Sequence, residues 1–134
     1  MVEAKAIWTD RDRLLGETIT GHALVVDTGE AKTAASPIEL VLIALCGCTA
    51  SDVVGILRKK REPFIGLEVV ARAERAEEHP KVFTAIKLVY RVRGRIANKA
   101  MEDAVRLSKE KYCSVSAMLE KSARIEYEIQ YADP

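Results

Sequence analysis

The sequence contains few of the residues that build metal centres and many catalytic sites. Its 134 residues include three cysteines, two histidines and one tryptophan, and aromatic residues make up only 5%. His22 and His79 stand far apart and in no zinc-binding spacing with the cysteines, so we expect no metal and no bound cofactor. The chain also has no nucleotide-binding glycine loop, serine-hydrolase elbow or acidic metal-binding loop.

Neither sign of charge dominates the chain. Its 21 basic and 20 acidic residues leave a net charge of +1, which provides no electrostatic footprint for nucleic acid or an anionic membrane. The longest apolar run, residues 40–50, is shorter than a bilayer span, and residues 1–5 lack the pattern of a signal peptide. An odd number of cysteines fits a reducing compartment. We therefore expect a soluble cytoplasmic protein.

The patterns that are present predict a single α+β domain over residues 1–134. Apolar residues make up 49% of the chain, and no linker or repeat interrupts it. Strand patterns cover residues 4–8, 17–20, 22–26, 67–73, 82–92 and 124–131. A helical stripe runs from residue 98 to about residue 111, and a short helix is expected over 114–121. Strands grouped in hairpins with helices between them indicate the α+β class.

The clearest helix start in the sequence lies at Ser36. Ser36 can cap the helix, Pro37 suits the first helical position, and Glu39 completes a capping box. The helix can continue until Pro63 prevents it. Nearly every residue of 40–50 is apolar, so we expect this half of the helix to be buried.

Two cysteines are candidates for redox chemistry. Cys48 lies inside this apolar helix, and Cys113 lies 65 residues later in a Tyr-Cys-Ser-Val-Ser-Ala segment. If folding brings them together, one thiolate can attack an electrophile and the other thiol can resolve the product as a disulfide. The alternatives are that Cys48 is a small buried hydrophobe and that Cys113 is inert. Cys46 faces nearly the opposite side of the helix, so we expect it to pack in the core.

These motifs together resemble the OsmC/Ohr family of osmotically induced and organic-hydroperoxide-resistance proteins. The resemblance lies in Ser-Pro-Ile-Glu-Leu at 36–40, the apolar helix to Cys48, the Tyr-Cys-Ser-Val-Ser segment at 112–116 and a terminal strand. The Glu-His-Pro-Lys-Val-Phe stretch at 78–83 is similar to the OsmC-like branch. The resemblance covers essentially the whole chain. It implies an OsmC/Ohr-like fold: short N-terminal strands, a long buried cysteine helix, antiparallel strands, a second helix pair and a C-terminal strand, in an intertwined homodimer.

The same resemblance implies roles for individual residues. Cys48 would be the peroxidatic cysteine and Cys113 the resolving one, with a hydroperoxide as substrate and an external dithiol as reductant. Arg11 resembles the family's thiolate-stabilising arginine, and Arg13 is the alternative. Glu39 stands one position after the family's arginine-orienting carboxylate, so it is either that residue or only a helix cap.

Two further expectations concern charge near the cysteines. Asp52 lies one helical turn after Cys48 and would disfavour a thiolate there; it either anchors an arginine, faces solvent or, as we favour, has a structural role. Cys113 precedes the helix expected over 114–121, whose N–H groups and dipole would favour a thiolate at Cys113.

Three functional hypotheses follow. The first is a thiol-dependent peroxidase in oxidative-stress defence that reduces organic hydroperoxides by a sulfenic acid and disulfide cycle. The second is a non-enzymatic, stress-associated binding dimer on the same fold, and the third is a dithiol–disulfide exchanger. The peroxidase hypothesis predicts neighbouring sulfurs with a guanidinium beside Cys48. The exchanger hypothesis predicts neighbouring sulfurs without the arginine, and the binding hypothesis predicts sulfurs well apart or a Cys48 that is sealed from any pocket.

Overall fold

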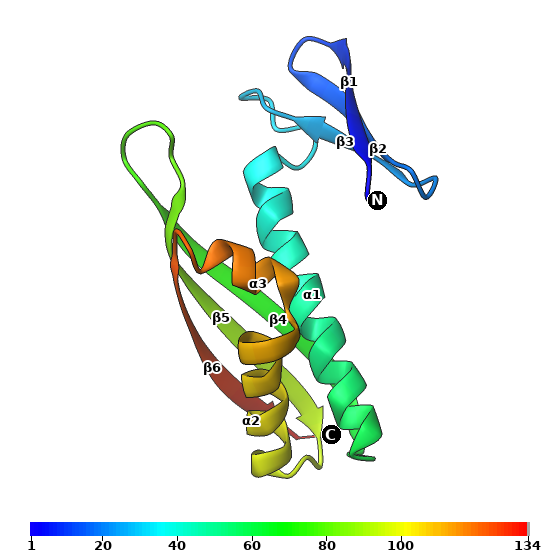
Figure 1. Cartoon of the computed structure of the whole chain (residues 1–134), viewed down its shortest axis with the longest axis vertical. Coiled ribbons are helices and arrows are strands. Elements are labelled where there is room, and N and C mark those ends of the chain that lie inside the picture. The colour runs from blue at the N-terminus through cyan, green and yellow to red at the C-terminus, as the bar shows by residue number, and fades with distance from the viewer. Residues whose placement is uncertain (134) are drawn as a thin grey trace. The chain divides into compact units, whose positions relative to one another are not determined.

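The computed structural model describes residues 1–133 and divides the chain into two compact units, Met1–Leu42 and Ile43–Pro134, which share one long helix. Each unit is described by itself (Figure 1). The elements in chain order are β1 (Ala4–Asp10), β2 (Arg13–Thr18), β3 (Ala23–Asp27), α1 (Pro37–Lys59), β4 (Phe64–Arg75), β5 (Phe83–Gly94), α2 (Asn98–Leu107), the π-helical turn η1 (Ser108–Tyr112), α3 (Ser114–Leu119) and β6 (Arg124–Ala132). The predicted α+β class is confirmed. The strand predicted over residues 17–20 is misplaced: β2 lies over Arg13–Thr18, and residues 19 and 20 form a turn.

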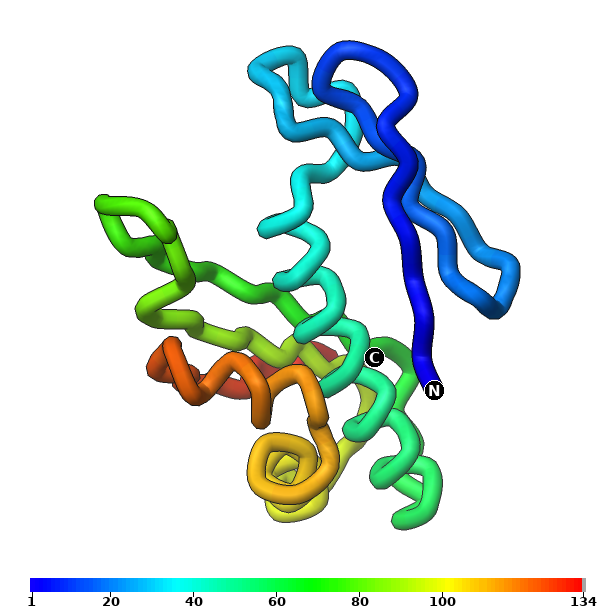
Figure 2. The backbone as a smooth tube through the Cα atoms, turned by 45° about the horizontal axis from the view of Figure 1, so that its top comes forward, coloured from blue at the N-terminus to red at the C-terminus, as the bar shows by residue number. Residues whose placement is uncertain are grey.

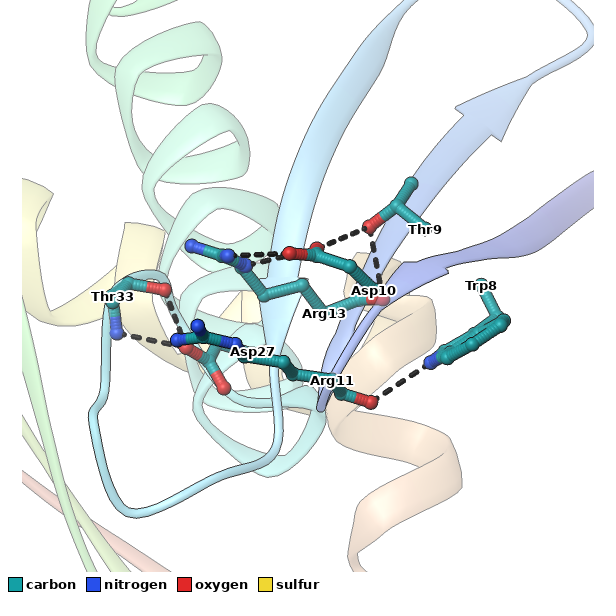
Figure 3. Close-up of polar contacts among 7 residues, drawn as sticks. All are labelled: Trp8, Thr9, Asp10, Arg11, Arg13, Asp27 and Thr33. Atoms are coloured by element: carbon teal, nitrogen blue, oxygen red, sulfur yellow. Dashed lines mark hydrogen bonds and ion pairs between the residues drawn. The ribbon is translucent and has the colours of Figure 1, made fainter.

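The N-terminal unit is built on an antiparallel sheet in the order β1-β2-β3. The turn between β1 and β2 is closed by the Trp8 side chain, whose Nε1–H donates to the Arg11 carbonyl at 2.8 Å (Figure 3). Arg11 has a φ of 47°. This left-handed conformation is unusual for a residue with a side chain. The Trp8 ring itself is 68% exposed, so it closes the turn without joining a core.

Asp27 at the end of β3 organises the segment that leads into α1. Its buried carboxylate accepts a hydrogen bond from the Gly29 N–H at 2.8 Å. It also accepts from the Thr33 N–H, at 3.0 Å, and from the Thr33 hydroxyl (Figure 3). The Thr33 hydroxyl bond, followed by the two backbone bonds, lowers the pKa of Asp27 below its usual value. A polar loop is thereby fixed without regular secondary structure.

Helix α1 begins with the predicted capping box. The Glu39 carboxylate accepts from the Ser36 N–H and hydroxyl, each at 2.9 Å, and the Glu39 N–H donates to Ser36 Oγ at 3.3 Å. The helix buries a stripe with one residue per turn: Leu45, Thr49, Val53 and Leu57. The prediction that residues 40–50 are wholly buried is wrong for a single chain, because the Ile43 side chain is 61% exposed. One chain has too few elements to cover every face of so apolar a helix.

By length and composition alone, α1 could cross a membrane, since an 18-residue window has a mean hydropathy of 2.2. The core helices of soluble proteins meet the same criterion. Here the helix places a polar residue, Thr49, at a fully buried position, where Thr49 hydrogen bonds to Tyr90 and Ser108. Helix α1 thus carries part of a polar network inside the C-terminal unit.

The C-terminal unit is built on a sheet in the order β4-β5-β6. Strands β4 and β5 form the predicted hairpin, and β6 pairs with β5 in parallel because α2 and α3 carry the chain back before it enters the sheet. The central strand β5 is the most buried, with Ile86, Leu88, Tyr90 and Val92 alternating as the sequence predicts. Figures 1 and 2 show α2, α3 and the second half of α1 on the same face of this sheet.

The helix predicted over residues 98–111 changes its geometry before it ends. It is α-helical through Leu107 and then widens into the π-helical turn η1. The Cys113 N–H closes this turn by donating to the Ser108 carbonyl at 2.8 Å. Such single π-turns are frequent at functional sites. This one leaves Ser108 fully buried and Cys113 at the start of α3.

Candidate functional site

The structure brings Cys48 and Cys113 together. Their Sγ atoms and a carboxylate oxygen of Asp52 all lie within 4.8 Å of one another. Both thiols are free, with Cys48 partly exposed and Cys113 only 3% exposed. Figure 2 shows the α2–α3 connection passing beside the middle of α1, which is how residues so distant in the chain meet. This places two thiols and one carboxylate in a single cluster.

Local structure explains how each side chain reaches the cluster. Cys48 and Asp52 are one turn apart on α1 and share a face. Cys113 is the N-cap of α3, and its Sγ accepts from the Ser116 N–H at 3.4 Å. The next residue, Ser114, places its Oγ 3.9 Å from Cys48 Sγ. The start of α3 therefore presents polar groups to the sulfur on α1.

The environment of Cys48 favours its thiolate. Burial is the largest influence and opposes ionisation, but hydrogen bonds from the Val115 N–H, the Cys113 thiol and the Ser114 hydroxyl outweigh it and lower the pKa of Cys48. The negative charge of Asp52 acts in the opposite direction. A lowered pKa increases the thiolate fraction near neutral pH, and the thiolate is the nucleophile.

The environment of Cys113 has the opposite effect. Burial, together with donation of its proton to Cys48, raises the pKa of Cys113 to about 12 despite the hydrogen bond from the Ser116 N–H. The prediction that the start of the helix favours a thiolate at Cys113 is therefore wrong. The reason is that Cys113 is desolvated, while the Val115 amide of the same helix serves Cys48. The two sulfurs are neighbours with different protonation.

Asp52 is held by a buried chain of hydroxyl groups. Ser108 Oγ donates to its Oδ2 at 2.8 Å. Thr49 Oγ1 lies 2.8 Å from Ser108 Oγ and 2.6 Å from the Tyr90 hydroxyl. Thr49, Ser108 and Tyr90 are each at most 1% exposed. Within residues 1–133 no lysine, arginine or histidine forms an ion pair with Asp52, so the alternative in which it anchors an arginine is not what the structure shows.

Sequence reasoning missed these hydroxyl groups as members of the site. Tyr90 and Ser108 lie on the apolar stripes of their strand and helix, and Thr49 is the one hydroxyl-bearing residue in the apolar run at 40–50. The sequence did contain a signal for them: each is a polar residue at a position that the apolar pattern of its helix or strand predicts to be buried. A buried hydroxyl needs a partner, so several on faces that pack together predict a network.

Arg11, Arg13 and Glu39 lie in the N-terminal unit. Arg13 pairs with Asp10 through two hydrogen bonds at 3.1 and 2.6 Å, and the two groups shift each other's pKa toward the charged forms (Figure 3). The Arg11 guanidinium forms no hydrogen bond or ion pair within residues 1–133, which leaves it available as a cation. Glu39 is engaged by Ser36. The approach of either arginine to Cys48 stays a prediction, as does an orienting role for Glu39.

Cys46 lies outside the cluster, and the cluster itself has too few donors for a structural metal site. Cys46 is partly buried, and that burial raises the pKa of its thiol, as expected of a packing residue. Cys48, Asp52 and Cys113 offer three donors, and no fourth His, Cys, Asp or Glu joins them in the described part of the chain. Structural zinc sites have four protein ligands, so this cluster is not a closed structural site, and the expected absence of a metal stays a prediction.

A groove of about 440 Å³ lies along α1 next to the cluster. Asp52 forms one part of its wall, and Lys59 and Lys60 form another. The other lining residues are Ser51, Gly55, Ile56, Leu107 and Tyr112. The groove gives Asp52 a route to solvent.

Comparison with known proteins identifies relatives over the whole fold. A family model described as OsmC-like protein matches residues 29–128. Protein YhfA of Escherichia coli K12 is 44% identical over 125 residues, which covers 92% of this chain and 93% of YhfA. A hypothetical protein from Aquifex aeolicus has a solved structure that is 31% identical, with a TM-score of 0.86 and coverage of 98% of both chains.

A further solved structure with this fold is named for hydroperoxide resistance. The organic hydroperoxide resistance protein OsmC from Legionella pneumophila superposes with a TM-score of 0.73, covering 97% of this chain and 96% of that one. Its sequence is 20% identical, so the likeness is one of fold. The predicted family and fold are thus confirmed by sequence and by structure.

Proposed function

Because the chain belongs to the OsmC-like family of soluble α+β proteins, we propose that it is a thiol-dependent peroxidase that reduces hydroperoxides through Cys48 and Cys113. The family includes proteins named for organic hydroperoxide resistance. The observation that carries the proposal is the pair of free thiols within 4.8 Å of each other, one partly exposed with a lowered pKa and the other buried and protonated.

The proposed reaction begins at Cys48. Its thiolate attacks the terminal oxygen of the hydroperoxide, the O–O bond breaks, and the alkoxide takes up a proton and leaves as an alcohol. Cys48 becomes a sulfenic acid. Cys113 then attacks that sulfur, water leaves, and a Cys48–Cys113 disulfide forms. An external dithiol reduces the disulfide by two exchange steps and restores both thiols.

The proposal also assigns an arginine to the active site, a homodimeric assembly to the chain and the cytoplasm as its compartment. Either Arg11 or Arg13 would approach Cys48 and stabilise the negative charge of the thiolate and of the leaving alkoxide, with Glu39 as the carboxylate that could orient it. A homodimer would cover the apolar surface of α1 that a single chain leaves open, such as Ile43 at 61% exposure. Free thiols and a dithiol reductant suit the reducing cytoplasm.

One observation favours a second candidate, a dithiol–disulfide exchanger. The groups that lower the pKa of Cys48 are hydrogen-bond donors of the C-terminal unit and include no cation. A thiol pair activated in this way can exchange with disulfides without any peroxide specificity. The third hypothesis, a non-enzymatic binding dimer, is less well supported, because it expects sulfurs that lie apart.

Hydroperoxide consumption tests the proposal. Wild-type protein, Cys48→Ser and Cys113→Ser would be mixed with cumene hydroperoxide and dithiothreitol, with Cys46→Ser as the matched control. We expect Cys48→Ser to lose turnover, Cys46→Ser to keep it, and Cys113→Ser to accumulate a sulfenic acid that dimedone traps. Turnover that survives Cys48→Ser would reject the proposal. Rapid reduction of a disulfide substrate with no consumption of hydroperoxide would favour the exchanger.

A further inference from the structure

We propose that Asp52 is the proton acceptor that allows the buried Cys113 thiol to attack Cys48 in the resolving step. This inference rests on the proposed function and adds a catalytic residue to it. The need for an acceptor follows from the burial of Cys113, whose side chain is 3% exposed. A thiol must lose its proton to become a nucleophile, and solvent does not reach this one directly.

Asp52 is in position to take that proton. Its carboxylate lies within 4.8 Å of both sulfurs, a distance that one water molecule or a side-chain rotation bridges. In the reduced protein the Cys113 proton is donated to the Cys48 thiolate. Once Cys48 has become a sulfenic acid, that thiolate no longer exists. Asp52 is then the carboxylate closest at hand for the proton.

The hydroxyl chain fixes the position of this carboxylate. Ser108 has one hydroxyl proton and donates it to Asp52 Oδ2. Thr49 must therefore donate to Ser108, and Tyr90 must donate to Thr49, so all three groups point their protons toward Asp52. With Oδ2 engaged by Ser108, the other oxygen of the carboxylate is the one that can accept a proton. Within residues 1–133, Asp52 Oδ1 forms no hydrogen bond, so it is free for this purpose.

The surroundings also provide an exit for the proton. Asp52 is part of the wall of the groove of about 440 Å³ along α1. A proton received from the buried Cys113 can therefore pass to the leaving group or to solvent. The arrangement links a buried donor to water through a single carboxylate, which gives a role to an acidic residue beside a thiolate that it otherwise disfavours.

The step balances as follows. The Cys113 S–H bond breaks and its proton goes to the Asp52 carboxylate. The Cys113 sulfur forms a bond to the Cys48 sulfur, the S–O bond of the sulfenic acid breaks, and the departing hydroxide takes the proton from Asp52 as water. Cys113 is oxidised and the Cys48 sulfenic acid is reduced to the level of a disulfide. Asp52 returns to its initial state.

The test uses 5,5′-dithiobis(2-nitrobenzoate) on full-length protein carrying Cys46→Ala, so that only the cysteine pair reacts. Attack by Cys48 releases one thionitrobenzoate, and attack by Cys113 on the mixed disulfide releases a second. Asp52→Asn keeps an oxygen for the Ser108 hydrogen bond but removes the basic carboxylate. We expect the second release to slow about tenfold or more, while the first is at least as fast as before.

Two control variants complete the test. Glu128→Gln removes a surface carboxylate that pairs with Lys87 on the sheet and should change neither phase. Ser108→Ala keeps the Asp52 carboxylate but cuts the hydroxyl chain, and should slow the second release less than Asp52→Asn does. The inference is overturned if the second release in Asp52→Asn matches that of Glu128→Gln, if both phases slow equally, or if the parent protein releases no second thionitrobenzoate. The assay contains no hydroperoxide, so a protein that fails the peroxide assay can still support the role of Asp52.

Discussion

The sulfurs of Cys48 and Cys113 lie no more than 4.8 Å apart, yet their surroundings drive their pKa values in opposite directions. Cys48 receives hydrogen bonds from the start of α3 and is partly exposed, whereas Cys113 is desolvated inside the C-terminal unit. This difference in pKa and exposure indicates which cysteine reacts first. The exposed, more acidic thiol meets the electrophile first, and the buried thiol follows.

The first prediction concerns selective alkylation. With a limiting amount of iodoacetamide at neutral pH, we expect Cys48 to be modified well before Cys113, because alkylation requires both a thiolate and access. Peptide mapping by mass spectrometry would measure the modified fraction at each position. Denatured protein is the control, since its cysteines should react at similar rates. Equal labelling of the two residues in folded protein would contradict the opposed protonation.

The second prediction concerns pH and Ser114. A lowered pKa means that the Cys48 thiolate forms at a lower pH than an ordinary cysteine thiolate, so its alkylation rate should rise at lower pH. Ser114→Ala removes one of the donors that lower this pKa, so the midpoint should move upward. The measurement is the rate of Cys48 alkylation between pH 5 and about pH 10. Ser122→Ala on the turn after α3 is the matched control, and an unchanged midpoint in Ser114→Ala would argue against this donor.

The third prediction concerns stability. Thr49→Val preserves shape but leaves the buried Tyr90 hydroxyl without its partner and removes one of the two hydrogen bonds of Ser108, which keeps its bond to Asp52. We expect the free energy of unfolding in urea to fall by about 1–3 kcal/mol, the cost of unsatisfied buried polar groups. Tyr90→Phe combined with Thr49→Val should cost less than the sum of the two single changes, because one unpaired hydroxyl is removed. Strict additivity would mean that the two groups do not interact.

Much of the fold follows from local patterns in the sequence. The capping box at Ser36 fixes the start of α1, and the alternating apolar residues identify β5, although Val89 on its opposite face is buried as well. The π-helical turn could not be predicted, since a helical stripe through Ser108 looks the same whether the backbone is α or π. The parallel pairing of β6 with β5 depends on how α2 and α3 pack, which is a tertiary property.

The site was predictable to a similar extent. The two cysteines stand out by type and by a familiar spacing, but their protonation does not. The helix start suggested a thiolate at Cys113, and burial reverses that effect. Asp52 could be placed near Cys48 by helical periodicity alone, whereas its hydroxyl partners come from β5 and η1 and are known only once the chain is folded.

The last prediction concerns the open face of α1 and the proposed homodimer. Ile43 exposes 61% of its surface on a helix whose mean hydropathy reaches 2.2, so a second copy of the chain would bury it. We expect wild-type protein to be a dimer by light scattering coupled to size exclusion, and Ile43→Asp to dissociate because it would bury an unpaired charge. Ile43→Leu keeps an apolar side chain of equal volume and should remain a dimer. Monomeric wild-type protein, or a dimer unaffected by Ile43→Asp, would mean that this face of α1 is not the interface.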